Sequence, residues 1–155
     1  MEFEALWQEA LRRVERVKEA GGKVVFTNGV FDLIHPGHLE VLRQARDLGD
    51  FLVVGINSDE SVRRLKGLRR PIMNLEERME VLRAIRYVDL VVPFAEDTPL
   101  RLIEYLRPHV LVKGGDYRPE EVVGRDLVDN VVIIPYVEGS STSQIIGRIL
   151  ERYCL

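Results

Sequence analysis

Cysteine and long apolar runs are almost absent from this chain. The single cysteine, Cys154, has no partner for an internal disulfide and belongs to no metal-binding or redox motif. No apolar run approaches the roughly 20 residues that a helix needs to cross a bilayer, and the chain starts without a basic and apolar leader. These absences predict a cytoplasmic protein that has no membrane partner.

A basic excess is missing as well. The chain has 22 Lys and Arg residues against 25 Asp and Glu residues, and the two signs are interspersed. A surface that binds nucleic acid needs basic residues gathered in excess on one face. The composition therefore argues against nucleic acid as a partner, and basic groups at any site are expected to act locally.

Two nucleotide-binding signatures are also missing. No Gly-x-Gly-x-x-Gly string follows the first predicted strand, which argues against a dinucleotide cofactor, and the absence of a Gly-Lys-Ser/Thr string excludes a P-loop. What is present is a globular composition, because 155 residues with 46% hydrophobic content suffice for one domain with a proper core. We expect a single domain over residues 1–155.

Helical and extended patterns alternate along the chain. Apolar residues at helical spacing predict an amphipathic helix over residues 3–20, with Trp7 in its apolar stripe and therefore in the core. Short apolar runs predict five strands, at residues 23–27, 50–56, 88–92, 110–113 and 131–134. This order predicts an α/β fold, a Rossmann-like five-stranded parallel sheet with helices on both faces and a ligand crevice at the carboxyl ends of its strands.

Residues 27–38 form a corner between the first strand and the next helix that is typical of phosphate binding. Pro36 suits the first turn of a helix, and Gly37 lets an anion approach the free N–H groups of that turn. His35 and His38 flank this helix start, and each imidazole can donate hydrogen bonds to phosphate oxygens. Two other interpretations are weaker, namely a metal site, which lacks a third ligand nearby, and simple helix capping.

Polar residues follow several of the predicted strands. Asn57 and Asp59 stand after the second strand, and Lys113 and Asp116 flank the glycine pair that ends the fourth. Because the ligand crevice of an open parallel sheet lies outside the carboxyl ends of its strands, the topology places these residues there. For Asp59, helix capping and substrate contact are equally well supported.

Two further stretches can bind phosphate. Residues 62–71 are the densest basic stretch, and Gly67 and Pro71 within it indicate a loop that closes over a site. Residues 138–143 contain small hydroxyl residues before the last predicted helix. Such residues cap a helix and also build a second anion site from hydroxyl and N–H groups, and we expect both roles together.

The string Gly29-x-Phe31-Asp32-x-x-His35-x-Gly37-His38 resembles the signature of the cytidylyltransferase-like nucleotidyltransferases, whose His-x-Gly-His element cradles the phosphates of a nucleoside triphosphate. Other strings are similar to the heptose 1-phosphate adenylyltransferase branch, an enzyme that occurs alone or as the C-terminal half of a bifunctional kinase/adenylyltransferase. They are Arg64-Leu65-Lys66-Gly67 with Arg70-Pro71, Glu96-Asp97-Thr98-Pro99 and, most specifically, Lys113-Gly114-Gly115-Asp116-Tyr117. One departure is that Tyr136-Val137 stand where the cytidylyltransferases carry Arg-Thr, which argues against a cytidine nucleotide.

The resemblance implies a role for each matching residue. Catalysis would rest on His35, His38 and Lys66, whereas Arg63, Arg64 and Arg69 are expected at the surface. Helix periodicity alone would put Arg78 at the surface too, so its place in the site comes from the resemblance. The nucleotide would be bound by Val30, Phe31, His35, Gly37, His38, Arg78, Lys113, Gly115, Asp116, Ser141 and Thr142. The second substrate would be bound by Asp32, Asn57, Asp59 and Lys66.

The reaction implied by the resemblance is transfer of AMP from ATP to a sugar 1-phosphate, heptose 1-phosphate, which gives an ADP-sugar and pyrophosphate. The expected partners are ATP, the sugar phosphate and a second copy in a homodimer, with Mg²⁺ bound mainly through the triphosphate and no metal ligand from the protein. Two alternatives stay open: a cytidylyltransferase acting on glycerol 3-phosphate or another polyol phosphate, and a nucleotide-binding module without catalysis.

Overall fold

The computed structural model describes residues 2–154, and all five predicted strands are present in it, with ends that differ by up to two residues from the prediction. The elements in chain order are α1 (Glu4–Glu19), β1 (Val24–Gly29), α2 (Pro36–Asp47), β2 (Phe51–Asn57), α3 (Asp59–Lys66), α4 (Leu75–Arg83), β3 (Leu90–Phe94), α5 (Leu100–Leu106), β4 (Val110–Gly114), the 3₁₀ turns η1 (Pro119–Glu121) and η2 (Arg125–Leu127), β5 (Asn130–Ile134) and α6 (Thr142–Tyr153).

The strands form one five-stranded sheet in the order β3-β2-β1-β4-β5, and every neighbouring pair is parallel. The chain moves outward from β1 through β2 to β3, then returns to the other side of β1 with β4. The strand order therefore reverses beside β1, which is the point where a ligand crevice forms in such sheets. The predicted parallel sheet is confirmed.

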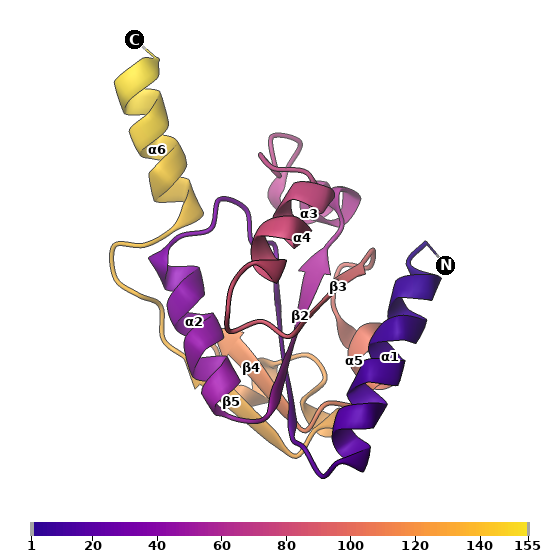
Figure 1. The fold of residues 1–155 in the computed structure, drawn as a ribbon. Coiled ribbons are helices and arrows are strands. Elements are labelled where there is room, and N and C mark those ends of the chain that lie inside the picture. Colours follow the sequence, from indigo (N-terminus) through magenta and orange to yellow (C-terminus); the bar gives the residue numbers. More distant parts are fainter. Residues whose placement is uncertain (1, 155) are drawn as a thin grey trace.

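Helices cover both faces of the sheet, as predicted (Figure 1). On one face α1 and α5 enclose a core that includes Trp7, whose Nε1 donates to the carbonyl of Pro93 at 2.8 Å. On the other face α2 and α4 pack through Leu42 and Leu82 against the alternate strand residues. Each strand thus sends successive side chains into two separate cores, which explains its continuous apolar sequence.

Helix starts follow the local sequence closely. Asn74 and Glu77 form the predicted reciprocal cap of α4, with each side chain accepting from the other residue's backbone N–H at 3.0 Å. At α3 the cap is Ser58, whose Oγ accepts from the N–H of Ser61. Asp59, the other candidate for this cap, is already the first residue of the helix.

α6 stands away from the rest of the molecule (Figure 1). None of its residues is buried, although it has an amphipathic sequence. Across residues 2–154, we find no helix with the length and apolar character needed to span a bilayer.

Candidate active site

A cavity of about 840 Å³ opens at the carboxyl ends of the strands. Its walls come from the ends of β1, α3 and β4, the start of α2, the loop before α5 and the segment leading into α6. The predicted site residues that line it are Val30, Phe31, Asp32, His35, Gly37, His38, Asn57, Lys66, Lys113, Ser141 and Thr142.

The two histidines stand side by side at the start of α2, with ring centroids 3.8 Å apart. Nδ1 of His35 accepts from the N–H of Gly37 at 3.1 Å, and Nδ1 of His38 accepts from the N–H of His35 at 3.2 Å. A neutral imidazole whose Nδ1 accepts a hydrogen bond carries its proton on Nε2. Both rings therefore offer an Nε2–H donor at a wall of the cavity.

Both imidazoles are neutral at pH 7. The pKa of His38 is lowered to about 4, mainly by burial and also by the nearby His35, while the charge of Asp32 opposes the shift. Burial also lowers the pKa of His35. Two neutral donors that are fixed by backbone hydrogen bonds suit an oxyanion or phosphoryl oxygen, because they need no reorganisation when charge develops.

The backbone at the start of α2 differs from the expectation. The N–H groups of Gly37 and His38 were expected to be free for an anion, but they donate to Nδ1 and to the carbonyl of His35, respectively. The backbone of this turn thus orients the imidazoles, which become the donors. Gly37 is required for close packing, since a Cβ there would lie 2.8 Å from Cε1 of His35 and 3.3 Å from Cβ of Ser140.

The start of α6 lies directly against the same corner. Ser141 caps α6 by accepting from the N–H of Gln144 at 3.1 Å, and the hydroxyl of Thr142 donates to the carbonyl of Asp32 at 2.6 Å. Ser140 is the neighbour that a side chain at Gly37 would meet. The two helix starts therefore meet at one cavity, as the sequence predicted.

Arg78 is placed differently from the prediction. Its side chain is fully buried, and it does not line the cavity. The guanidinium donates to the carbonyls of Val30, Asn57 and Met73 and to the carboxylate of Asp59, at 2.6 to 3.0 Å. Arg78 thus joins the ends of β1 and β2. Neither Arg78 nor Asp59, predicted to bind the nucleotide and the second substrate, lines the cavity, because the two side chains pair with each other.

Asp32 and Asn57 line the cavity but are held by the protein itself. The carboxylate oxygens of Asp32 accept from the N–H groups of Ile72 and Met73 at 2.7 and 3.0 Å, and Asn57 donates to the hydroxyl of Ser61 at 2.9 Å. Asp32 therefore fixes the loop before α4 beside the histidine corner. The described residues contain no group of three or more His, Cys, Asp or Glu side chains that could hold a metal ion.

The cytidylyltransferase-like family model matches residues 26–148. The chain belongs to the cytidylyltransferase-like family. It is 55% identical over 144 residues to the bifunctional protein HldE of Pelobacter propionicus, and 56% identical over 151 residues to HldE of Syntrophotalea carbinolica. These matches cover 90% and 94% of this chain, but only 30% and 31% of the two relatives.

A solved structure supports the family fold. The crystal structure of the lipopolysaccharide core biosynthesis protein from Thermoplasma volcanium matches with a TM-score of 0.65 and 25% sequence identity. The match covers 76% of this chain and 100% of that chain.

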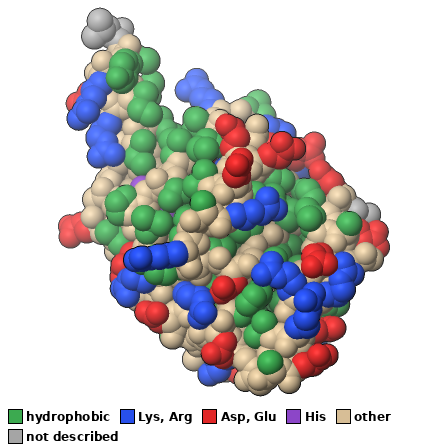
Figure 2. All heavy atoms as spheres, in the orientation of Figure 1, with side chains coloured by type: hydrophobic (Ala, Val, Ile, Leu, Met, Phe, Trp, Pro, Cys, Tyr) green, Lys and Arg blue, Asp and Glu red, His purple; other side chains and the backbone are tan. Residues whose placement is uncertain are grey.

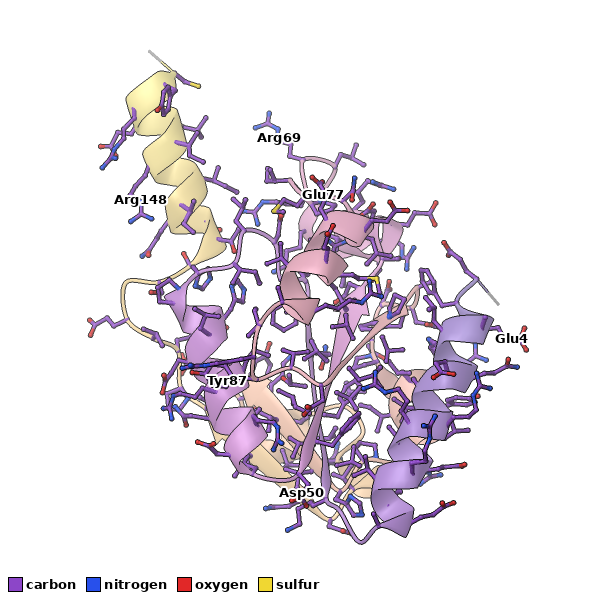
Figure 3. All side chains as sticks on the ribbon, viewed as in Figure 1. Glu4, Asp50, Arg69, Glu77, Tyr87 and Arg148 are labelled. Atoms are coloured by element: carbon purple, nitrogen blue, oxygen red, sulfur yellow. The ribbon has the colours of Figure 1, made fainter. Side chains whose placement is uncertain are left out.

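The basic stretch at residues 62–71 contributes two basic residues to the cavity, Lys66 and Arg70. Arg70 escaped the sequence prediction, although it belongs to the string that resembles the heptose branch; its Nη2 lies 3.2 Å from the hydroxyl of Ser143 on α6. Arg64 does not line the cavity and pairs with Asp97 at the cavity wall, and Arg69 points outward from the tip of the loop (Figure 3). The surface positions predicted for these two arginines are confirmed.

The loop after β4 lies partly outside the cavity. Gly115 and Asp116 do not line it, and Asp116 is exposed. Gly115 has a φ of +119°, and a Cβ there would lie 2.6 Å from the ring of Tyr136, so its role in the structure is to allow this close packing. Tyr136 and Tyr117 are cavity residues that the sequence prediction missed, because neither stands at the end of a strand or the start of a helix.

Proposed function

We propose that this chain is an adenylyltransferase that moves AMP from ATP to the phosphate of a sugar 1-phosphate, with heptose 1-phosphate as the acceptor, and releases pyrophosphate. The observation that carries the proposal is the meeting of the α2 and α6 starts at one cavity, with the Nε2–H groups of His35 and His38 at its wall. Identity above 50% with proteins named HldE supports the choice of acceptor, as do the sequence strings that resemble the heptose branch.

The proposed chemistry is an in-line displacement at the α-phosphorus of ATP. An oxygen of the acceptor phosphate forms a bond to that phosphorus, the bond to the bridging β-phosphate oxygen breaks, and pyrophosphate leaves with the electron pair. A phosphate monoester has a second pKa of about 6 and is already ionised at neutral pH, so the protein does not have to supply a general base. Its contribution is to position the two substrates and to stabilise charge.

The histidine corner and α6 would act on different parts of ATP. The two Nε2–H groups would donate to the non-bridging oxygens of the α-phosphate, where negative charge grows in the transition state. The start of α6, with its positive helix dipole and the hydroxyl of Ser143 beside Arg70, would bind the pyrophosphate end. Adenylyl transfer is thus divided between a fixed donor pair and a phosphate-binding helix start.

Mg²⁺ in this proposal is bound through the triphosphate oxygens. Asp32 lines the cavity together with the histidines, but both its carboxylate oxygens already accept backbone hydrogen bonds. The ion would neutralise charge on the triphosphate, and the residues described above would orient the substrates.

A pyrophosphate-release screen tests the proposal. ATP and CTP are each combined with heptose 1-phosphate, other sugar 1-phosphates and glycerol 3-phosphate. We expect turnover with ATP and heptose 1-phosphate. Turnover only with CTP and glycerol 3-phosphate would replace the proposal with a cytidylyltransferase, and tight ATP binding without any pyrophosphate would indicate a nucleotide-binding module.

His38→Asn tests the role of the donor pair. The Oδ1 of asparagine occupies the place of Nδ1 and can still accept from the N–H of His35, whereas the Nε2–H donor is lost. We expect kcat to fall about 10²–10³-fold, while the affinity for ATP and the unfolding midpoint change little. Normal turnover by this variant would contradict the assignment. Gln144→Ala, an exposed change on α6, serves as the control.

A further inference from the structure

Two lysines line the cavity without a partner of opposite charge. Lys113 extends from the end of β4, and Lys66 is the last residue of α3. Among the described residues, neither ammonium group takes part in a salt bridge. Like charges that share a partly buried cavity repel each other, so this arrangement favours the binding of an anion.

The acidic residues of the cavity do not neutralise the lysines, because each has another partner. Asp32 accepts two backbone N–H bonds, Asp97 pairs with Arg64 at 2.8 Å, and Glu121 lies 3.8 Å from Arg118. These are all the carboxylates at the cavity wall. The positive charge of the two lysines is therefore available to a ligand.

Lys113 lies on the opposite face of the sheet from α2. Side chains alternate along a strand, so Lys113 shares a face with Leu111, which packs in the core beneath α1 and α5. The histidine corner belongs to α2, which packs on the other face through Leu42. The ring centroid of Tyr117 lies 5.0 Å from Nζ of Lys113 and helps to fix the side chain. Lys113 and the histidines thus approach the end of β1 from different sides of the sheet.

Electrostatics supports this arrangement. Burial lowers the pKa of Lys113, and the charge of Lys66 lowers it further. Lys66 is therefore close enough to act on Lys113 across the cavity. An anion bound between the two groups would stabilise both ammonium forms and reverse the shift.

We infer that Lys113 and Lys66 together bind the phosphate of the acceptor, and that Lys113 selects a second substrate that carries a phosphate dianion. The identity of this acceptor rests on the proposed function. The inference removes Lys113 from the nucleotide-binding set in which the sequence prediction placed it. Two ammonium groups on one phosphate leave the third terminal oxygen free to face the α-phosphorus of ATP, which the α2 and α6 starts hold on the other side.

The inference is tested by comparing how a variant of Lys113 changes the KM for the sugar 1-phosphate and the KM for ATP. Lys113→Met keeps the length of the side chain and removes its charge, so the KM for the sugar 1-phosphate rises about 10- to 100-fold and the KM for ATP changes less than about twofold. Lys113→Arg restores part of the loss. Lys23→Met, an exposed change at the opposite end of β1, leaves both constants unchanged. A rise in the KM for ATP alone, or no change in either KM, would overturn the inference.

A chemical-protection experiment tests the same site without turnover. Acetylation of Lys113 by acetic anhydride is followed by mass spectrometry, with Lys23 as the internal reference. Glucose 1-phosphate or inorganic phosphate should slow acetylation of Lys113, and a non-hydrolysable ATP analogue should not. Protection by the ATP analogue alone would assign Lys113 to the nucleotide and refute the inference.

The two experiments also separate this inference from the proposed reaction. Protection by phosphate without any pyrophosphate release would contradict the adenylyltransferase proposal and support the lysine site. Pyrophosphate release with an unprotected Lys113 would support the reaction and refute the site.

Discussion

The two helix starts at the cavity are attached to the molecule in very different ways. α2 is built into the core, where Gly37, Leu42 and Ala45 are buried. α6 buries no residue and is tied to the corner by the hydroxyls of Thr142 and Ser143. Apolar side chains line the side of α6 that faces the body of the molecule (Figure 2), whereas Arg148 points away from it (Figure 3). A helix of 12 residues is marginal alone, so the order of α6 depends on what it contacts.

The different attachment of α2 and α6 matches the different parts of ATP that the two helix starts are proposed to bind. The histidine donors must keep their geometry while charge develops at the α-phosphate, and a buried helix with fixed imidazoles provides that. The start of α6 would bind the leaving pyrophosphate, which has to depart in every cycle. We therefore expect changes on the α2 side to alter stability and kcat, and changes along α6 to have small effects on stability.

The largest expected effect comes from Arg78, which supports the α2 side. Arg78→Met leaves three backbone carbonyls and Asp59 without their buried donor and should lower the free energy of unfolding by about 3–5 kcal/mol. Urea denaturation measures this. The matched change on α6, Arg148→Met, removes an exposed arginine and should stay within about 0.5 kcal/mol. If Arg78→Met lost as little unfolding free energy as Arg148→Met, the role of Arg78 in joining the ends of β1 and β2 would be contradicted.

A pair of leucine variants compares the two helices directly. Leu42 on α2 is fully buried, and Leu150 on α6 is 52% exposed. Leu42→Ala should cost about 2–5 kcal/mol of unfolding free energy, and Leu150→Ala about 0.5 kcal/mol or less. An equally large cost for Leu150→Ala would mean that another surface covers α6 in solution, as the predicted homodimer would. Sedimentation of both variants and the wild type distinguishes that case.

The smallest expected effect concerns pH. His38 has a pKa of about 4 in the folded protein and about 6.5 when unfolded, so its contribution to stability is complete above pH 6.5 and is lost as the pH falls toward 4. Between pH 7.5 and 5, the wild type should lose on the order of 1 kcal/mol more than His38→Asn. Chemical denaturation at both pH values measures the difference, and Gln144→Ala should retain the wild-type profile. Parallel losses in all three proteins would argue against a buried, neutral His38.

Local sequence predicted the parts of the fold and site that depend on neighbours along the chain. The capping pair Asn74 and Glu77 follows from a three-residue spacing, and the position of His35 and His38 follows from a strand, a turn and Pro36. The apolar stripe of α6 was also recognisable in the sequence, but an amphipathic pattern does not determine whether the helix packs into a core. That depends on where the segment after β5 leads the chain.

The sequence by itself determined the parallel sheet, the two helix starts and the donor-bearing histidines, because apolar period, glycine, proline and capping residues act over a few positions. Only the tertiary structure decided which polar groups are already satisfied and which remain available. Arg78 and Asp32 find their partners in segments 19 to 48 positions away, whereas Lys66 and Lys113 meet in one cavity without a counter-ion. The physical reason is that hydrogen bonds and charge pairs are decided by distance in space, and the order of strands around β1 sets those distances.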